Sequence, residues 1–253
     1  MGIIRKIINH EKAVIDHLEE INYSNVWHDT IKGIEWAEGL SGVSPGRAAV
    51  GYNYLYVMTR ILNELRPDCV LDIGLGISST LISQYFANCY EKGQAADSCD
   101  VGGHYILEHS EEWIDFYKKE HFLSKYSTII MHQLVVKTID GNKFYAYENL
   151  EEDVSKHKYD VISIDAPYGF GFQNKNGNQK YSRRDMIELL PQILKSEFVI
   201  VLDDVNRVGE KNTANDIIRK LEMEGIKVYN RVYRGQNYCC VIASERYMYM
   251  TSL

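Results

Sequence analysis

The chain has 253 residues, of which 45% are hydrophobic and 25% are charged, enough for one large α/β domain with a substantial core. Its net charge of −7, with basic residues no more clustered than in pairs, disfavours a nucleic-acid partner. There is no apolar stretch long enough to span a membrane, no secretory signal and no C-x-x-C spacing among the five cysteines, so we expect a cytoplasmic protein with reduced thiols.

Residues 1–66 are predicted to form an N-terminal helical cap. Apolar residues recur at roughly helical spacing over the first forty positions, which predicts an irregular helical segment there: Ile7, Ile8, Val14, Ile15, Leu18 and Ile21. A loop over Ser41–Gly46 follows. Ser44 as N-cap and Pro45 in the first helical position predict a further helix, which ends before Pro67.

Residues 67–253 alternate between strand-like and helix-like segments, which predicts a doubly wound, Rossmann-like α/β sheet of seven strands. The predicted strands are Cys69–Ile73, Tyr105–Glu108, Thr128–Val136, Tyr159–Asp165, Phe198–Asp203, Val228–Tyr233 and Tyr238–Ser244. The predicted helices are Ser79–Tyr90, Glu111–His121, Arg184–Leu194 and Thr213–Glu224.

Three connections shape this prediction. The last two strands are joined by the short turn Arg234–Asn237, so one antiparallel strand is expected near an edge of an otherwise parallel sheet. Two polar segments lengthen the connections after the first predicted helix of the sheet domain and after its fourth strand: Glu91–Gly103 and Tyr168–Tyr181. Long polar loops at the carboxyl ends of strands are where such folds place substrate contacts.

A glycine-containing turn follows the first of these strands. Asp72 closes the strand, Gly74 and Gly76 form a Gly-x-Gly turn, and Ser78 opens the helix. Glycines let the backbone approach a ligand closely, and a helix N-terminus offers free N–H groups. This arrangement is typical of nucleotide-like cofactor sites, although Gly-x-Gly alone is a weak signal.

Acidic residues end four predicted strands, at Asp72, Glu108, Asp165 and the pair Asp203–Asp204. Carboxylates gathered at one edge repel one another unless a cation joins them, and a sulfonium cofactor and a divalent metal both fit. Glu108 stands where an acidic residue accepts hydrogen bonds from ribose hydroxyls, although later than the usual spacing of about 20 residues. The alternative is a solvent-facing Glu108.

The aspartates at the two later strand ends form a candidate metal site. Asp165, Asp203 and Asp204 supply the oxygen ligands that Mg²⁺ or a similar hard ion prefers, and Asn206 could add a carbonyl oxygen. The alternative is that Asp203 or Asp204 caps the next helix or pairs with Arg207.

Five segments in this order resemble the class I S-adenosylmethionine-dependent methyltransferases: Asp-Ile-Gly-Leu-Gly, Leu-Glu-His-Ser-Glu-Glu-Trp-Ile, Asp-Ala-Pro-Tyr-Gly, Ser-Arg and Asp-Asp-Val-Asn-Arg. More narrowly, the chain is similar to the glucuronoxylan 4-O-methyltransferase-type family, which methylates sugar hydroxyls in polysaccharides. The similarity covers roughly residues 69–244 and is weakest over Asp140–Lys158.

The resemblance implies roles for individual residues at the cofactor and at the acceptor. Asp72, Gly74, Gly76 and Ser78 would lie at the methionine end of the cofactor, Glu108 and His109 at its ribose, Asp165 beside both cofactor and acceptor, Arg183 against an acidic sugar, and Asp204 at the fifth strand end. Arginine binds a carboxylate or phosphate through two parallel hydrogen bonds, so an anionic acceptor is expected. Alternatively, Arg183 pairs with Asp185, Glu188 or the helix surface.

The expected reaction is in-line transfer of a methyl group from S-adenosylmethionine to a hydroxyl oxygen, with Asp165 as general base and Asp204 and Arg183 beside it. A small phosphorylated or phenolic metabolite is the alternative acceptor. A nicotinamide-dependent oxidoreductase is a rival from another class, but Ser79 stands where G-x-G-x-x-G needs its third glycine. A non-catalytic binding module is a further rival, since the fold alone does not set the function.

Overall fold

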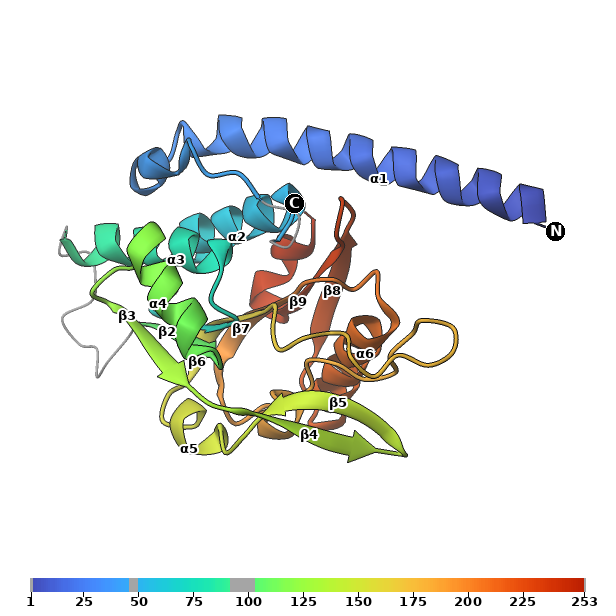
Figure 1. The fold of residues 1–253 in the computed structure, drawn as a ribbon. Helices are drawn as coiled ribbons and strands as arrows, with labels where there is room; N and C mark the ends of the chain where they lie inside the picture. Colours follow the sequence, from blue (N-terminus) through green and yellow to red (C-terminus); the bar gives the residue numbers. More distant parts are fainter. Residues whose placement is uncertain (1, 46–49, 92–102, 253) are drawn as a thin grey trace.

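The computed structural model describes residues 2–45, 50–91 and 103–252, and it has a seven-stranded sheet at its centre (Figure 1). The strand order is β3-β2-β1-β6-β7-β9-β8. The strands are β1 (Cys69–Ile73), β2 (Gly103–Glu108), β3 (Ser127–Met131), β6 (Tyr159–Ile164), β7 (Leu194–Leu202), β8 (Val228–Tyr233) and β9 (Cys239–Ser244).

The predicted fold class is confirmed, including its antiparallel strand. Pairs among β3, β2, β1, β6 and β7 are parallel, whereas β9 runs antiparallel to both β7 and β8. The turn after Tyr233 returns the chain directly along β8, so no crossover helix separates the last two strands. The parallel strands therefore bring their carboxyl ends to one edge, where Ile73, Glu108, Ile164 and Leu202 end them.

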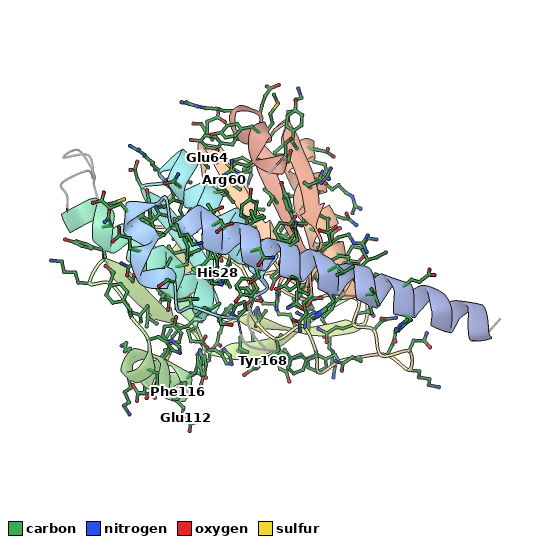
Figure 2. The ribbon with its side chains drawn as sticks, turned by 90° about the horizontal axis from the view of Figure 1, so that it is seen from above. His28, Arg60, Glu64, Glu112, Phe116 and Tyr168 are labelled. Carbon is green, nitrogen blue, oxygen red and sulfur yellow. The ribbon has the colours of Figure 1, made fainter. Side chains whose placement is uncertain are left out.

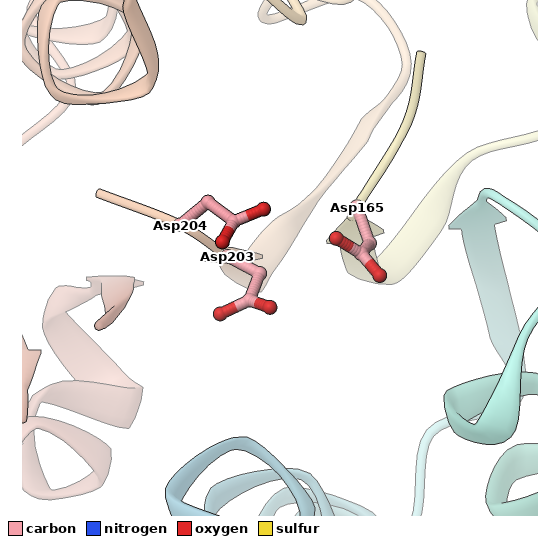
Figure 3. A group of neighbouring side chains, drawn as sticks. All are labelled: Asp165, Asp203 and Asp204. Atoms are coloured by element: carbon pink, nitrogen blue, oxygen red, sulfur yellow. The ribbon is translucent and has the colours of Figure 1, made fainter. Parts of the chain in front are cut away.

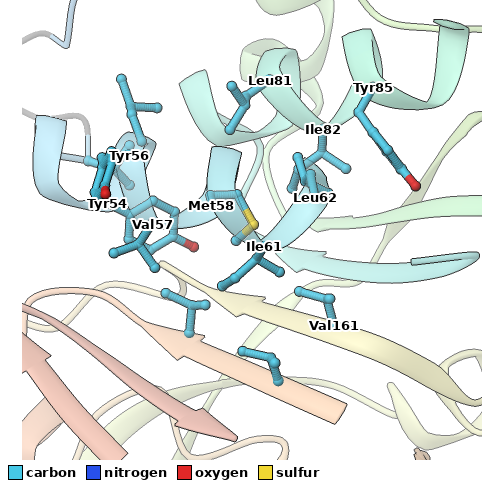
Figure 4. Close-up of a cluster of buried hydrophobic side chains, with 14 of the residues drawn as sticks. Tyr54, Tyr56, Val57, Met58, Ile61, Leu62, Leu81, Ile82, Tyr85 and Val161 are labelled. Atoms are coloured by element: carbon cyan, nitrogen blue, oxygen red, sulfur yellow. The ribbon is translucent and has the colours of Figure 1, made fainter. Parts of the chain in front are cut away.

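Helices cover both faces of the sheet, and each face has its own hydrophobic cluster. The helices α2 (Tyr52–Leu65) and α3 (Ile77–Glu91) pack on one face, where Figure 4 shows Met58 and Ile61 of α2 near Val161 of β6. Side chains of α5 (Glu151–Val154) and α6 (Val208–Met223) pack on the other. Cys69, Cys239 and Cys240 are buried thiols, as expected from the sequence.

The remaining short helices are α4 (Glu111–Glu120) and the 3-10 helices η1 (Glu35–Leu40), η2 (Ile187–Leu189) and η3 (Glu245–Thr251). The cluster on the α2 face contains residues from both sides of position 66, so cap and sheet share one core. The division into 1–66 and 67–253 stays a prediction.

The N-terminal segment is not irregular. It forms one continuous helix, α1 (Gly2–Ile31), which crosses above the rest of the molecule (Figures 1 and 2). Trp27 and Ile31 are buried in the core, so α1 is covered toward its C-terminal end, whereas Leu18 of the expected apolar face is 60% exposed. No helix in the described ranges is long and apolar enough to cross a membrane.

The strand predicted over Thr128–Val136 is two strands in two sheets. β3 ends at Met131, opposite Glu108, because there β2 ends and no partner remains. The chain then enters a separate hairpin of β4 (Leu134–Ile139) and β5 (Asn142–Tyr147). Alternating apolar residues continue through both strands, so the sequence pattern does not indicate where β3 ends and β4 begins.

Helix boundaries account for the other corrections. Arg184–Leu194 holds only η2, because Pro191 lacks a backbone N–H and Leu194 already begins β7. α2 begins at Tyr52 after Gly51, and the helix start predicted at Ser44 and Pro45 leads into residues 46–49, which lie outside the described ranges. The insertion predicted over Glu91–Gly103 lies almost entirely outside the described residues.

Candidate active site

The Gly-x-Gly turn lies at the carboxyl end of β1, and its two glycines differ. Gly74 has a φ of +110°, and a Cβ there would lie 2.8 Å from the Cβ of Ala166. Only glycine fits this position without strain. A Cβ at Gly76 would meet no atom within 4 Å, so the backbone before α3 borders open space that a ligand can approach.

Asp72 lies under this turn and is fully buried. Its carboxylate accepts hydrogen bonds of 2.5 Å from the hydroxyls of Ser79 and Ser163. The Ser163 hydroxyl is 2.6 Å from that of Tyr54, which is buried on α2. Both Asp72 oxygens therefore have protein partners, and the carboxylate fastens the start of α3 to the sheet. Spacing along the sequence gave no sign of this contact, because the chain separates Tyr54 and Ser163 widely.

Ser78 and Ser79 occupy the first turn of α3, and both are buried. The Gly76 N–H donates to the Ser79 hydroxyl at 3.1 Å, and that hydroxyl donates onward to Asp72. The serine thus links the Gly-x-Gly turn to the buried carboxylate. These side-chain contacts stabilise the shape of the turn.

Glu108 ends β2 directly beside the same turn. Its Oε2 accepts from the Leu75 N–H at 3.2 Å, and its Oε1 accepts from the N–H groups of His109 and Ser110. The Nδ1 of His109 lies 2.8 Å from Oε1. Burial would raise the pKa of Glu108, but the hydrogen bonds from His109 and Ser110 outweigh it and lower the pKa below its ordinary value. Glu108 is therefore an ionised acceptor, not a solvent-facing residue.

Asp165, Asp203 and Asp204 come together at the ends of β6 and β7 (Figure 3). One carboxylate oxygen from each lies within 4.8 Å of the others. The sequence correctly predicts this cluster, because neighbouring parallel strands end at one edge.

Arg183 supplies the cation that this cluster needs. Its guanidinium lies 3.1 Å from Asp165 Oδ1 and 2.8 Å from Asp204 Oδ2. It also donates to the backbone oxygens of Pro167 and Asp203. Neither Asp185 nor Glu188, the expected alternatives, pairs with it in the described part of the chain. Arg183 is 5% exposed, so its donors face the protein and not an open acceptor site.

Arg207 is a second cation at the cluster. It pairs with Asp204, as the alternative reading of the sequence expected, and its Nε lies 3.1 Å from the buried Glu210. Glu210 in turn lies against Gly169, where a Cβ would clash with it. The two arginines thus tie together the strand ends, the start of α6 and the polar loop after β6.

The protonation of the cluster follows from burial. Burial and the charge of Asp165 raise the pKa of Asp203 well above its ordinary value, although Arg183 opposes this. Burial also raises the pKa of Asp165, against the attraction of Arg183. Asp203 Oδ1 has no hydrogen-bond partner among the described residues. Asp203 is therefore the aspartate of the cluster whose protonation is most favoured, whereas Asp165 lies within ion-pair distance of the Arg183 guanidinium.

The donor set has the hard oxygens that Mg²⁺ prefers, but the arrangement does not fit the ion. Arg183 occupies an oxygen of Asp165, and both arginines occupy Asp204. Only the carboxylate of Asp203 has no arginine within ion-pair distance in the ranges that the structure describes. A metal at these three aspartates would lie beside two guanidinium groups that already neutralise Asp165 and Asp204, which disfavours a divalent cation there.

An aromatic rim of His109, Tyr145 and Tyr168 borders the site; His109 was expected at the cofactor, and Tyr168 begins the polar segment expected to contact substrate. The Tyr168 hydroxyl lies 3.1 Å from His109 Nε2, and the two rings are 5.1 Å apart. Tyr145 of the hairpin packs against Tyr168 from the other side. Tyr168 is 46% exposed and is labelled in Figure 2. The hairpin that the sequence hid therefore contributes one wall of the site.

No protein-family model matches the sequence, and no curated protein matches it. Solved structures with a similar arrangement include a precorrin-6y C5,15-methyltransferase from Geobacter metallireducens, with a TM-score of 0.45 and 19% identity over 80% of this chain and 94% of that chain. The SAH-bound methyltransferase PaMTH1 from Podospora anserina has a TM-score of 0.39 and 12% identity over 97% of each chain.

A spermidine synthase from Thermotoga maritima has a TM-score of 0.44 and 15% identity over 77% of this chain and 58% of its own. Similarity at these levels says nothing about the activity of this chain.

Proposed function

We propose that the protein is an S-adenosylmethionine-dependent O-methyltransferase that methylates a hydroxyl of a sugar in a polysaccharide or its precursor. The observation that carries the proposal is the contact between the Gly-x-Gly turn and Glu108, through the Leu75 N–H at 3.2 Å. This hydrogen bond places the ionised Glu108 beside a glycine turn that borders open space, at one edge of the sheet. A cofactor with both a ribose and a charged amino-acid end needs these two features together.

The residues present fit this cofactor. In the part of the chain that the structure describes, Glu108 Oε2 has one partner, the Leu75 N–H, so this oxygen would accept hydrogen bonds from the ribose hydroxyls, and the open side of Gly76 would admit the methionine end. His109 and Tyr168 would border the adenosine, since their rings adjoin Glu108. Asp72 has both oxygens engaged inside the protein, so we assign it to holding the turn, in place of a direct contact with the cofactor.

When bound, the cofactor supplies a methyl group already activated on a positive sulfur. Transfer of that methyl group from sulfur to a hydroxyl oxygen would release the hydroxyl proton. We assign the proton to Asp165, which is partly exposed and lies nearest the glycine turn among the three aspartates, its N–H bonded to Ile73. Arg183 would orient this carboxylate and oppose the rise in its pKa that burial causes.

The buried position of Arg183 changes the expected basis for acceptor choice. Because its guanidinium donates to four groups of the protein, we propose that it positions Asp165 and Asp204 and does not grip an anionic sugar. The aromatic rim of Tyr145 and Tyr168 offers flat faces on which a sugar ring can pack. A phenolic or phosphorylated metabolite stays the second acceptor class.

The test is mass spectrometry of candidate glycans after incubation with S-adenosylmethionine. A gain of one methyl per accepted sugar, absent with Asp165→Asn, supports the proposal. Methylation of small phenols but no glycan would favour the second acceptor class. Saturable binding of NADH without binding of S-adenosylhomocysteine would favour the oxidoreductase instead.

A further inference from the structure

A pocket lies between α6 and the edge strand β8. It has a volume of about 310 Å³, at the small end of the range for ligand sites. Its walls come from α6, from β8 and β9, and from Lys12 of α1. None of Asp165, Arg183 and Glu108 lines it, so it is separate from the proposed active site.

Two lysines from distant parts of the chain line this pocket: Lys12 of α1 and Lys211 in the first turn of α6. Across the described ranges, no carboxylate lies within ion-pair distance of either ammonium. In a protein with a net charge of −7, two uncompensated cations on one small hollow are unusual. They favour an anion as its occupant.

The position of Lys12 is fixed by contacts of α1 one turn further on. Asp16 accepts from the Tyr238 hydroxyl at 2.7 Å and pairs with Arg234 at 2.8 Å. The ammonium of Lys12 lies 5.3 Å from the centre of the Tyr238 ring. These contacts hold the helix at the pocket and give the N-terminal extension a role there.

The floor of the pocket is apolar. Val205, Ala214 and Cys240 are buried and belong to the hydrophobic cluster on the α6 face. Carboxamides of Asn206, Asn215 and Asn230 stand around it and can each donate or accept hydrogen bonds. The lining therefore suits a molecule with one apolar side as well as a charge.

We propose that this pocket binds a small organic anion, with a carboxylate or phosphate between Lys12 and Lys211 and an apolar ring or chain over Val205 and Cys240. The site does not depend on the proposed methyl transfer. Inorganic phosphate satisfies only the lysines, whereas phenyl phosphate and benzoate satisfy both parts of the pocket.

The test is calorimetric titration of the full chain with phenyl phosphate, benzoate and inorganic phosphate. We expect saturable binding of phenyl phosphate or benzoate, at least about tenfold tighter than inorganic phosphate. The double variant Lys12→Gln/Lys211→Gln should weaken that binding by at least about tenfold. Val232→Trp, which adds a ring at the exposed pocket rim, should abolish it.

Lys227→Gln is the matched control, because Lys227 precedes β8 outside the pocket and pairs with Glu245. It should bind the probes as the unchanged protein does, and melting curves should show that every variant is folded. Absence of saturable binding up to about 10 mM, equal affinity for inorganic phosphate, or unchanged affinity in the double lysine variant would overturn the proposal.

Discussion

Glu108 at the end of β2 accepts from the Gly-x-Gly turn with Oε2 and from His109 and Ser110 before α4 with Oε1, and it is the residue on which cofactor binding should depend most. Replacing it with alanine removes an ionised acceptor for ribose hydroxyls. We expect Glu108→Ala to weaken S-adenosylhomocysteine binding by roughly 1.5–3 kcal/mol, as measured by calorimetry. Glu112→Ala on α4, labelled in Figure 2, is the control and should leave the affinity unchanged. Equal affinity in both variants would rule out the ribose role of Glu108.

Arg183 is buried between Asp165 and Asp204 and lowers the cost of their charges. Arg183→Gln keeps much of the side chain's size but removes the cation, so the pKa of Asp165 should rise. We therefore expect lower turnover, unchanged cofactor affinity and an acidic limb of the pH–rate profile moved to higher pH.

Arg183→Lys keeps the charge but not the paired geometry, so its acidic limb should move less than that of Arg183→Gln. A profile that does not move in either variant would contradict the positioning role. Weaker acceptor binding alone, seen as a higher KM at unchanged kcat, would instead restore the direct contact with an anionic sugar.

At the scale of elements, the turn between β1 and α3 gives a matched pair of variants. Gly74→Ala places a Cβ against Ala166 at a φ that disfavours side chains, so it should cost roughly 1–3 kcal/mol of unfolding free energy. Gly76→Ala meets open space and should change stability by less than about 0.5 kcal/mol, yet weaken S-adenosylhomocysteine binding. Thermal unfolding and calorimetry separate the two effects. Unchanged binding in Gly76→Ala would place the cofactor elsewhere.

The hairpin of β4 and β5 is linked to the connection between β6 and β7 by the buried carboxyl of Asp185. Asp185 accepts from the Tyr147 N–H at 2.7 Å, and burial raises its pKa from 3.8 to about 6. The folded protein therefore holds a proton that the unfolded chain releases between about pH 4 and 6. Stability contributed by this group is highest below pH 4, falls as pH rises through that window, and stays lower above it.

Asp185→Asn keeps an acceptor for Tyr147 and removes this penalty. We expect the variant to be more stable than the unchanged protein by up to about 3 kcal/mol at pH 7, with the difference vanishing near pH 4. Denaturant unfolding at several pH values measures it. A difference that does not depend on pH would contradict the raised pKa.

Local sequence patterns predicted the strands whose carboxyl ends form the candidate active site, because each of these strands is a short apolar run followed by an acidic residue. They misjudged elements whose limits depend on partners. β3 ends at Met131 because β2, its partner, ends there. No α-helix forms over Arg184–Leu194, because Pro191 lacks a backbone N–H and β7 already begins at Leu194. The same limit hid the network of Tyr54, Ser163 and Asp72, which exists only after α2 docks on the sheet.

At the scale of the whole molecule, the sequence predicted which charges gather but not how they are neutralised. Four acidic strand ends implied a cation, and a sulfonium or a metal fitted the pattern equally well. The fold brings Arg183 and Arg207 to the cluster from two different connections, which spacing does not reveal. The cytoplasmic location stays a prediction from composition.

Because these arginines occupy oxygens of Asp165 and Asp204, we expect turnover that needs no divalent ion. Full methyl transfer in excess chelator, with no gain on adding Mg²⁺, is the predicted outcome. Loss of turnover on chelation and its recovery with Mg²⁺ would show that a metal binds beside the arginines and would return Asp165, Asp203 and Asp204 to the role of ligands.

The most direct test of the central claim is a calorimetric comparison of S-adenosylhomocysteine and NADH on the unchanged protein and on Glu108→Ala. The account predicts saturable binding of S-adenosylhomocysteine at one site per chain, weakened in the variant, and no saturable binding of NADH. Saturable binding of NADH in place of S-adenosylhomocysteine, or binding of neither, would contradict it.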